Sequence, residues 1–239
     1  MKMNRRLVLF DIDGTLVLTH GAGMRAFYRG LAEVFSLAVD GEIINPDGKT
    51  DPLIAKECLA HFGQQHRWND DSRDSLFACY LACLEEEMEK ARLGSKIRVL
   101  PGVAALLDVL STMPEFALGL VTGNLEGGAR IKLSKAGLDK YFRFGGYGSD
   151  SEDRTELIRT AIQRGKEQIA PASVGAAFVI GDTPLDVKHG RAAGAYTIAV
   201  ASARYSMSDL RSCAPDLLVP ALTEVDAILS FLHRPVACS

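Results

Sequence analysis

The chain has 239 residues, of which 47% are hydrophobic and 24% charged, and its formal net charge at pH 7 is -3. This balance excludes a disordered chain and predicts a globular protein with a substantial core. The small negative charge excludes a global attraction to nucleic acid or to an anionic membrane, so any anionic ligand needs a local site.

Signals for targeting and for disulfide formation are few. No apolar run approaches the length of a membrane span, and the run after Arg6 is too short for the core of a signal peptide. We therefore expect a cytoplasmic protein that binds no membrane. The cysteines are odd in number and scattered, which indicates free thiols rather than a disulfide framework or a zinc site. They are Cys58, Cys79, Cys83, Cys213 and Cys238.

The first predicted strand is a short apolar run, Leu7 to Phe10, followed at once by Asp11, Asp13 and Gly14. A simple Asp-Gly turn is one interpretation. The other is a binding site, because open α/β sheets bind ligands at the carboxyl ends of their strands. On a continuing strand Asp11 and Asp13 would point to the same side, and a cation or a shared proton would have to relieve their repulsion.

A helical insertion follows, from about His20 to Leu93, where apolar residues recur at helical spacing and strand-like runs are nearly absent. Within it, Thr50 or Asp51 is the predicted N-cap of a helix that has Pro52 near its start. The turn before this helix has two open interpretations. It serves only to cap the helix, or it brings Lys49 and Thr50 over a neighbouring site as substrate contacts.

From Lys96 onward, predicted strands and helices alternate. The predicted strands are 116–121, 142–147, 176–180, 196–200 and a short 217–219. The predicted helices are 103–110, 125–136, 154–168, 184–193 and 221–232. Strands separated by helices imply right-handed crossovers, so we expect an α/β fold with a Rossmann-like, doubly wound parallel sheet and an inserted α-helical cap. The expected division is a core of residues 1–17 and 96–239 and a cap of residues 18–95.

The predicted strand at 116–121 also ends in polar residues, Thr122-Gly123-Asn124. A hydroxyl and the amides of a glycine-containing turn at a helix start suit a phosphate oxygen. Asn124 acting as a simple N-cap explains the same residue equally well.

The predicted strand at 176–180 is followed by Asp182, Thr183 and Asp186. Thr183 and Asp186 have the spacing of a capping box with Asp in place of Glu, whereas Asp182 has no such structural explanation. Arg154 opens the helix between these two stretches, where a lone arginine is usually a solvated ion pair. Acidic strand ends, however, need a cation among them.

In this order the four stretches resemble the motifs of the haloacid dehalogenase-like hydrolase superfamily, and the insertion resembles the helical cap of its phosphoglycolate phosphatase-like and β-phosphoglucomutase-like branch. The resemblance implies that Asp11 is the nucleophile and a metal ligand. It implies that Asp13 is the general acid and base and gives its backbone carbonyl to the metal. Asp182 would be a direct Mg2+ ligand, supported by Asp186.

The resemblance also implies a phosphate-binding set of Thr122, Gly123 and Asn124, completed by a basic residue. That position is usually Lys and is Arg154 here, whose planar fork can also bind phosphate. Lys132 and Lys135 are the reserve candidates, although they fall early, on the helix after Asn124.

The expected function is a Mg2+-dependent phosphatase that hydrolyses a small phosphorylated metabolite through an aspartyl phosphate. The expected protein is a monomer or homodimer that binds no nucleic acid. One alternative is a phosphosugar mutase or phosphotransferase, and another is a binding protein on the same fold that has lost turnover. A response-regulator receiver also has clustered aspartates, but its phosphate acceptor follows a later strand and it lacks a helical insertion.

Overall fold

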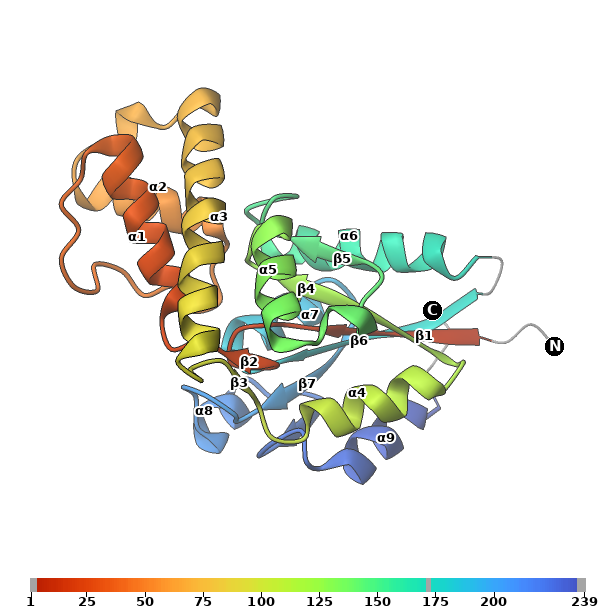
Figure 1. Cartoon of the computed structure of the whole chain (residues 1–239). Coiled ribbons are helices and arrows are strands. Elements are labelled where there is room, and N and C mark those ends of the chain that lie inside the picture. The colour runs from red at the N-terminus through yellow and green to blue at the C-terminus, as the bar shows by residue number, and fades with distance from the viewer. Residues whose placement is uncertain (1–3, 171–172, 236–239) are drawn as a thin grey trace.

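The computed structural model describes residues 4–170 and 173–235 (Figure 1). Within them lies a six-stranded sheet of order β5-β4-β1-β6-β7-β8 with every neighbouring pair parallel. Its strands are β1 (Asn4–Phe10), β4 (Phe116–Thr122), β5 (Gly145–Tyr147), β6 (Ser173–Gly181), β7 (Tyr196–Val200) and β8 (Leu217–Val219). The expected doubly wound α/β fold is confirmed.

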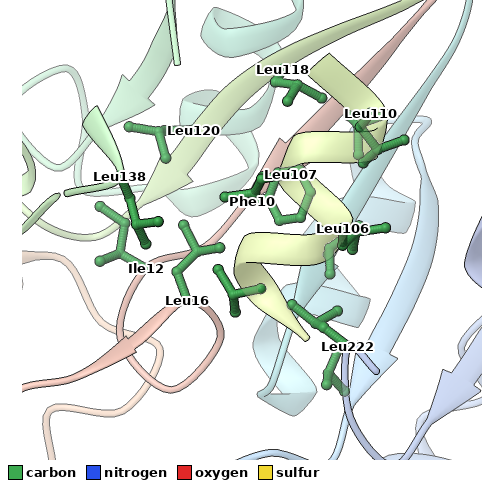
Figure 2. Close-up of a cluster of buried hydrophobic side chains, with 14 of the residues drawn as sticks. Phe10, Ile12, Leu16, Leu106, Leu107, Leu110, Leu118, Leu120, Leu138 and Leu222 are labelled. Carbon is green, nitrogen blue, oxygen red and sulfur yellow. The ribbon is translucent and has the colours of Figure 1, made fainter. Parts of the chain in front are cut away.

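The apolar run of β1 is continuous because this central strand is buried on both faces. Successive side chains of a strand point to opposite faces. Val8 and Phe10 therefore join a core cluster with α4 (Val103–Thr112) and α9 (Val225–His233) (Figure 2). Leu7 and Leu9 join a second cluster with α6 (Arg154–Gln168) on the other face.

Parallel register brings three strand ends to one edge of the sheet. Phe10 of β1 pairs with Leu120 of β4 on one side and with Ile180 of β6 on the other. The residues just beyond these pairs therefore meet at the carboxyl edge. α5 (Glu126–Ala136) and α7 (Pro184–Ala192) begin at this edge, after β4 and β6 respectively.

Several predicted boundaries agree with the structure and others do not. The elements at 154–168, 196–200 and 217–219 have the predicted bounds, and β6 is longer than predicted. β5 is shorter, because only Gly145 to Tyr147 pair with β4, and the short helix η2 (Asp139–Tyr141) lies before it. α9 begins at Val225 rather than at residue 221, because the backbone at Leu222 packs against Gly102, where a Cβ would lie 2.2 Å from the Leu222 carbonyl carbon. The helix α8 (Met207–Ser212) was not predicted.

The insertion is helical, as its periodicity predicts. It contains α1 (Ala22–Phe35), α2 (Asp51–His61), η1 (Gln65–Arg67) and α3 (Asp70–Leu93), and it stands over the end of the sheet beside α5 (Figure 1). These helices share a hydrophobic cluster, which includes Phe27, Leu59 and Tyr80 and is joined from the core by Leu125, just before α5. The chain enters and leaves the insertion through β2 (Val17–Leu18) and β3 (Arg98–Val99), an antiparallel pair that was not predicted.

The remaining expectations concern cysteines and membranes. Cys58, Cys79, Cys83 and Cys213 are free, whereas Cys238 lies outside the described residues. Glu33 brings a carboxylate within 4.8 Å of the sulfurs of Cys79 and Cys83, a neighbour that the sequence did not indicate. Burial raises the pKa of the Cys79 thiol to about 12, which favours the protonated form of this thiol. None of the helices in the described ranges is both long and apolar enough to cross a bilayer.

Candidate active site

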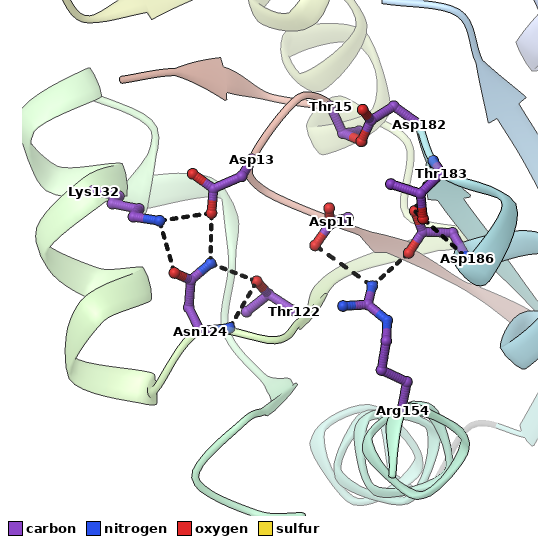
Figure 3. A network of polar contacts seen from close by, with 10 residues as sticks. All are labelled: Asp11, Asp13, Thr15, Thr122, Asn124, Lys132, Arg154, Asp182, Thr183 and Asp186. Atoms are coloured by element: carbon purple, nitrogen blue, oxygen red, sulfur yellow. Dashed lines mark hydrogen bonds and ion pairs between the residues drawn. The ribbon is translucent and has the colours of Figure 1, made fainter. Parts of the chain in front are cut away.

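The loop after β1 separates the first two carboxylates. β1 ends at Phe10 and the chain turns at Gly14, whose φ is +87° and where a Cβ would lie 2.3 Å from Asp182 Oδ2. The Asp11 side chain is buried, whereas the Asp13 side chain is 43% exposed and faces α5 (Figure 3). The strand does not continue through Asp13, so the expectation based on a continuing strand is wrong.

Asp13 is held by two donors that follow β4. Its Oδ2 accepts hydrogen bonds from Lys132 Nζ at 2.6 Å and from Asn124 Nδ2 at 2.7 Å (Figure 3). The same Asn124 amide group donates to Thr122 Oγ1 at 2.7 Å. The alternative of Asn124 as an N-cap is wrong, because α5 has Leu125 as its N-cap residue and no side-chain cap.

The turn at Gly123 lies directly under the helical insertion. A Cβ at Gly123 would lie 1.9 Å from the carbonyl oxygen of Lys49, and the Gly123 carbonyl accepts a hydrogen bond from the amide of Asp51 at 2.8 Å. Only glycine permits this approach of two backbones. The turn predicted to bind phosphate is therefore also a contact between the helical insertion and the rest of the chain.

Arg154 is a buried cation. It is the first residue of α6, after the N-cap Asp153, and its side chain is 6% exposed. Nη2 lies 2.5 Å from Asp186 Oδ1 and 3.8 Å from Asp11 Oδ1 (Figure 3). The alternative of a solvated surface ion pair is therefore wrong.

The two reserve lysines occupy different environments. Lys132 is buried beside Asp13, with 5% of its side chain exposed. Lys135 pairs with Glu85 and Glu89 of α3, away from the strand ends. Two buried cations thus lie at the candidate site, Arg154 near Asp11 and Lys132 beside Asp13.

The end of β6 supplies two more carboxylates. Thr183 and Asp186 form the predicted capping box of α7: the Asp186 amide donates to Thr183 Oγ1 at 3.2 Å, and the Thr183 amide donates to Asp186 Oδ2 at 3.0 Å. Asp182 is 3% exposed, and its Oδ1 accepts a hydrogen bond from Thr15 Oγ1 at 3.1 Å. Sequence reasoning assigned no role to Thr15.

Burial and neighbouring carboxylates raise the pKa of Asp11 and of Asp182. Burial, followed by the charge of Asp186, raises the pKa of Asp11 to about 7 against the opposing effect of Arg154. Burial and the charges of Asp11 and Asp186 raise the pKa of Asp182 to about 8. Oxygen atoms of Asp11, Asp182 and Asp186 lie within 4.8 Å of one another. Such a group of oxygen ligands suits a hard divalent cation such as Mg2+.

One cavity of roughly 360 Å³ connects these residues with the helical insertion. The core residues that line it include Asp11, Asp13, Thr122, Gly123, Asn124, Lys132, Arg154 and Asp182. The insertion contributes Lys49, which is ion-paired with Glu57, and the side chains of Met24, Phe27 and Tyr80. Thr50 is fully buried, accepts a hydrogen bond from the amide of Leu53 as the N-cap of α2, and is not among the lining residues.

Comparison with known proteins gives a family match over most of the chain. The family model described as haloacid dehalogenase-like hydrolase matches residues 8–200. Curated relatives include the pyrophosphatase PpaX of Bacillus anthracis and that of Bacillus cereus strain Q1. Each is 24% identical to this chain over 246 residues, with 98% of this chain and 100% of the relative covered.

Similar solved structures share the fold. A β-phosphoglucomutase from Clostridium difficile has a TM-score of 0.72 at 15% identity, covering 96% of this chain and 97% of its own. A protein described as a predicted phosphoglycolate phosphatase, from Haemophilus somnus 129pt, has a TM-score of 0.69 at 17% identity, covering 96% of this chain and 99% of its own. A hydrolase from Pseudomonas syringae has a TM-score of 0.68 at 19% identity, covering 95% of this chain and 98% of its own.

Proposed function

The chain belongs to the haloacid dehalogenase-like hydrolase family, and from this we propose that it is a Mg2+-dependent phosphatase of a small phosphomonoester. The observation that carries the proposal is the convergence of four chain segments on one cavity. Asp11 and Asp13, Thr122, Arg154 and Asp182 come from four separate segments of the core and line the same space. Phosphoryl transfer needs these parts together, namely a nucleophile, a proton donor and positive charge around the transferring group.

In the proposed first step Asp11 is the nucleophile. Its carboxylate oxygen forms a bond to phosphorus while the bond from phosphorus to the leaving oxygen breaks, giving an aspartyl phosphate. Asp13 gives a proton to the leaving oxygen. Thr122 and the amides at Gly123 and Asn124 bind the nonbridging oxygens, and Arg154 supplies positive charge beside Asp11.

In the second step water replaces the alcohol. Asp13, now ionised, takes a proton from water as the water oxygen attacks phosphorus, and the bond from phosphorus to Asp11 breaks. Inorganic phosphate leaves and Asp13 is again protonated. The enzyme returns to its starting state with no other reactant consumed.

The carboxylate cluster fits a magnesium ion. Buried carboxylates whose pKa values rise to about 7 and about 8 are costly to ionise together, and a divalent cation offsets that cost. Asp11, Asp182 and the backbone carbonyl of Asp13 would hold the ion, with Asp186 in support. When bound, the ion neutralises charge on the nonbridging phosphate oxygens.

We further propose that residues 18–95 act as a cap on a core formed by residues 1–17 and 96–239, of which 1–3, 171–172 and 236–239 lie outside the described residues. The hydrophobic cluster centred on α1, α2 and α3, which Leu125 joins from the core, and the two chain crossings at β2 and β3 support this division. A cap over a cavity of roughly 360 Å³ limits substrates to small phosphorylated metabolites. Efficient hydrolysis of a folded phosphoprotein would contradict this limit.

The test is phosphate release from a panel of small phosphomonoesters with Mg2+, by the wild-type protein and by Asp11→Asn. We expect turnover of at least one ester by the wild type and none by Asp11→Asn, because no aspartyl phosphate forms without the nucleophile. Isomerised sugar phosphate without free phosphate would identify a mutase instead. Tight binding of an ester without any product would identify a binding protein.

A further inference from the structure

We propose that Lys132 is a positioning residue for the leaving-group acid: together with Asn124 it holds Oδ2 of Asp13, so that Oδ1 is the oxygen presented to the substrate. The inference rests on the proposed function, in which Asp13 is the proton donor. It assigns to Lys132 a role different from that of the basic residue near the nucleophile, which is Arg154.

The contacts around Lys132 form a closed ring. Nζ donates to Asp13 Oδ2 at 2.6 Å and to Asn124 Oδ1 at 2.7 Å, and the Asn124 amide donates to the same Asp13 oxygen at 2.7 Å (Figure 3). Each of the three side chains therefore contacts both of the others. A carboxylate fixed by two donors on one oxygen has little freedom to rotate.

The two oxygens of Asp13 consequently have different environments. Oδ2 accepts both hydrogen bonds, whereas no hydrogen bond to Oδ1 is found in the described part of the chain. Asp13 lines the cavity, and 43% of its side chain is exposed. An oxygen that accepts two hydrogen bonds is poorly suited to carry a proton, so the proton that moves to the leaving oxygen is carried by Oδ1.

Lys132 is itself fixed by the packing around it. It lies two turns into α5 and is 5% exposed, and a Cβ on Gly23 of α1 would lie only 3.3 Å from Nζ. A buried ammonium is stable only when it is paired and hydrogen-bonded, and Asp13 and Asn124 satisfy both needs. The lysine therefore forms a rigid support for Asp13 from the side opposite to the metal-binding carboxylates (Figure 3).

The first test compares the kinetics of Lys132→Met and of its matched control Arg130→Met with an alkyl phosphate. Arg130 lies on the same helix, its side chain is 77% exposed, and it pairs only with Glu126 among the residues described. We expect Lys132→Met to lower kcat by about ten- to a hundredfold with KM nearly unchanged, because a misplaced acid slows the reaction without weakening substrate binding. Arg130→Met should match the wild type. Lys132→Gln, which keeps a hydrogen-bond donor, replaces Lys132→Met if that variant does not fold.

A double-mutant cycle separates positioning from other roles. In the Asp13→Asn background, we expect Lys132→Met to lower kcat by less than about a further threefold. Lys132 acts through the acid, and this background already lacks the acid. If Lys132→Met lowers kcat as much in the Asp13→Asn background as in the wild type, or if it changes only KM, then Lys132 binds phosphate or acts elsewhere. Either result would overturn the proposal.

Crystal structures of the wild type and of Lys132→Met give a readout that does not require turnover. We expect the Asp13 carboxylate to leave its position in the variant or to occupy several positions. An unchanged Asp13 would overturn the positioning role. Absence of phosphatase activity in the wild type would instead contradict the proposed function, and the crystal comparison would still decide the role of Lys132.

Discussion

The carboxylate of Asp51, the first residue of α2 in the insertion, accepts a hydrogen bond of 2.8 Å from the backbone amide of Leu125, at the start of α5 in the core. The amide of Asp51 in turn donates to the carbonyl of Gly123 at 2.8 Å. One residue of the insertion thus satisfies the free amide of the N-cap residue of a core helix, an amide that a side chain at the helix's own N3 position satisfies in a capping box. We call these two hydrogen bonds the Asp51 latch.

The first prediction tests the Asp51 latch through Gly123→Ala. The added Cβ would lie 1.9 Å from the Lys49 carbonyl oxygen, so the two backbones must move apart. We expect faster hydrogen exchange at the amide of Asp51 and a fall in kcat/KM of about ten- to a hundredfold, because the cap no longer closes fully over the site.

The control for that variant is Gly128→Ala, five residues further along the chain and in the first turn of α5. There a Cβ would make only ordinary contacts, with the nearest atom, Leu84 Cδ2, at 3.5 Å. Exchange at the amide of Asp51 should then match the wild type. Equal exchange rates in Gly123→Ala and Gly128→Ala would show that the close approach at Gly123 does not hold the cap.

The second prediction concerns the pH dependence of stability. Burial raises the pKa of Asp51 to about 6, against the lowering effect of the Lys132 charge. The pKa of an aspartate is about 3.9 in the unfolded chain. Between about pH 4 and about pH 6, folding is therefore accompanied by the uptake of a proton. The ionised carboxylate thus destabilises the fold increasingly as pH rises from about 4 to about 6, and this cost is absent below about pH 4.

The measurement is the free energy of unfolding of the wild type and of Asp51→Asn by urea titration at several pH values. Asparagine keeps an acceptor for the Leu125 amide but carries no charge. The stability of the variant relative to the wild type should therefore rise between pH 4 and pH 7, by at most about 3 kcal/mol. A difference that does not change with pH would contradict a raised pKa for Asp51.

The strand-end residues of the candidate site could be predicted because parallel register is regular. Phe10 lies beside Leu120 and Ile180, so the polar residues that follow each strand must meet at one edge. The helices at this edge carry local signals as well, and the capping box of Thr183 and Asp186 has the predicted form.

The remaining contacts could not be predicted because they join distant segments through side chains. Lys132 and Asp13 are 119 residues apart, and nothing in the helical pattern of α5 shows which of its lysines is buried. Likewise Arg204 pairs with Asp47 across 157 residues. Such contacts depend on where the insertion docks on the core, and hydrophobic periodicity does not specify that.

The third prediction concerns metal binding. Mg2+ should raise the midpoint of thermal unfolding of the wild type, because an ion that binds only the native carboxylate cluster stabilises the fold by about 2.7 kcal/mol at a hundred times its Kd. Asp182→Asn should lose most of this shift, whereas Asp226→Asn, on the exposed side of α9, should keep it.

EDTA should abolish phosphatase activity and added Mg2+ should restore it. Full activity in the chelator would exclude a metal requirement.

The last prediction concerns the reaction branch within the family, and it depends on Asp13. Release of a halide needs no proton, whereas an alkoxide is too basic to leave rapidly without one, and general acid catalysis contributes about a hundred- to ten-thousandfold. In Asp13→Asn the carboxamide oxygen can still accept the hydrogen bonds of Lys132 and Asn124, so the substitution removes the acid with little change of geometry.

We therefore expect hydrolysis of an alkyl phosphate by Asp13→Asn to slow by at least about a hundredfold. A phosphate ester with a good leaving group should lose less in the step that forms the aspartyl phosphate. Burst and steady-state rates for both substrates measure this difference. Equal losses in that first step would show that Asp13 is not the leaving-group acid, and halide release from a haloacid would assign the protein to the dehalogenase branch.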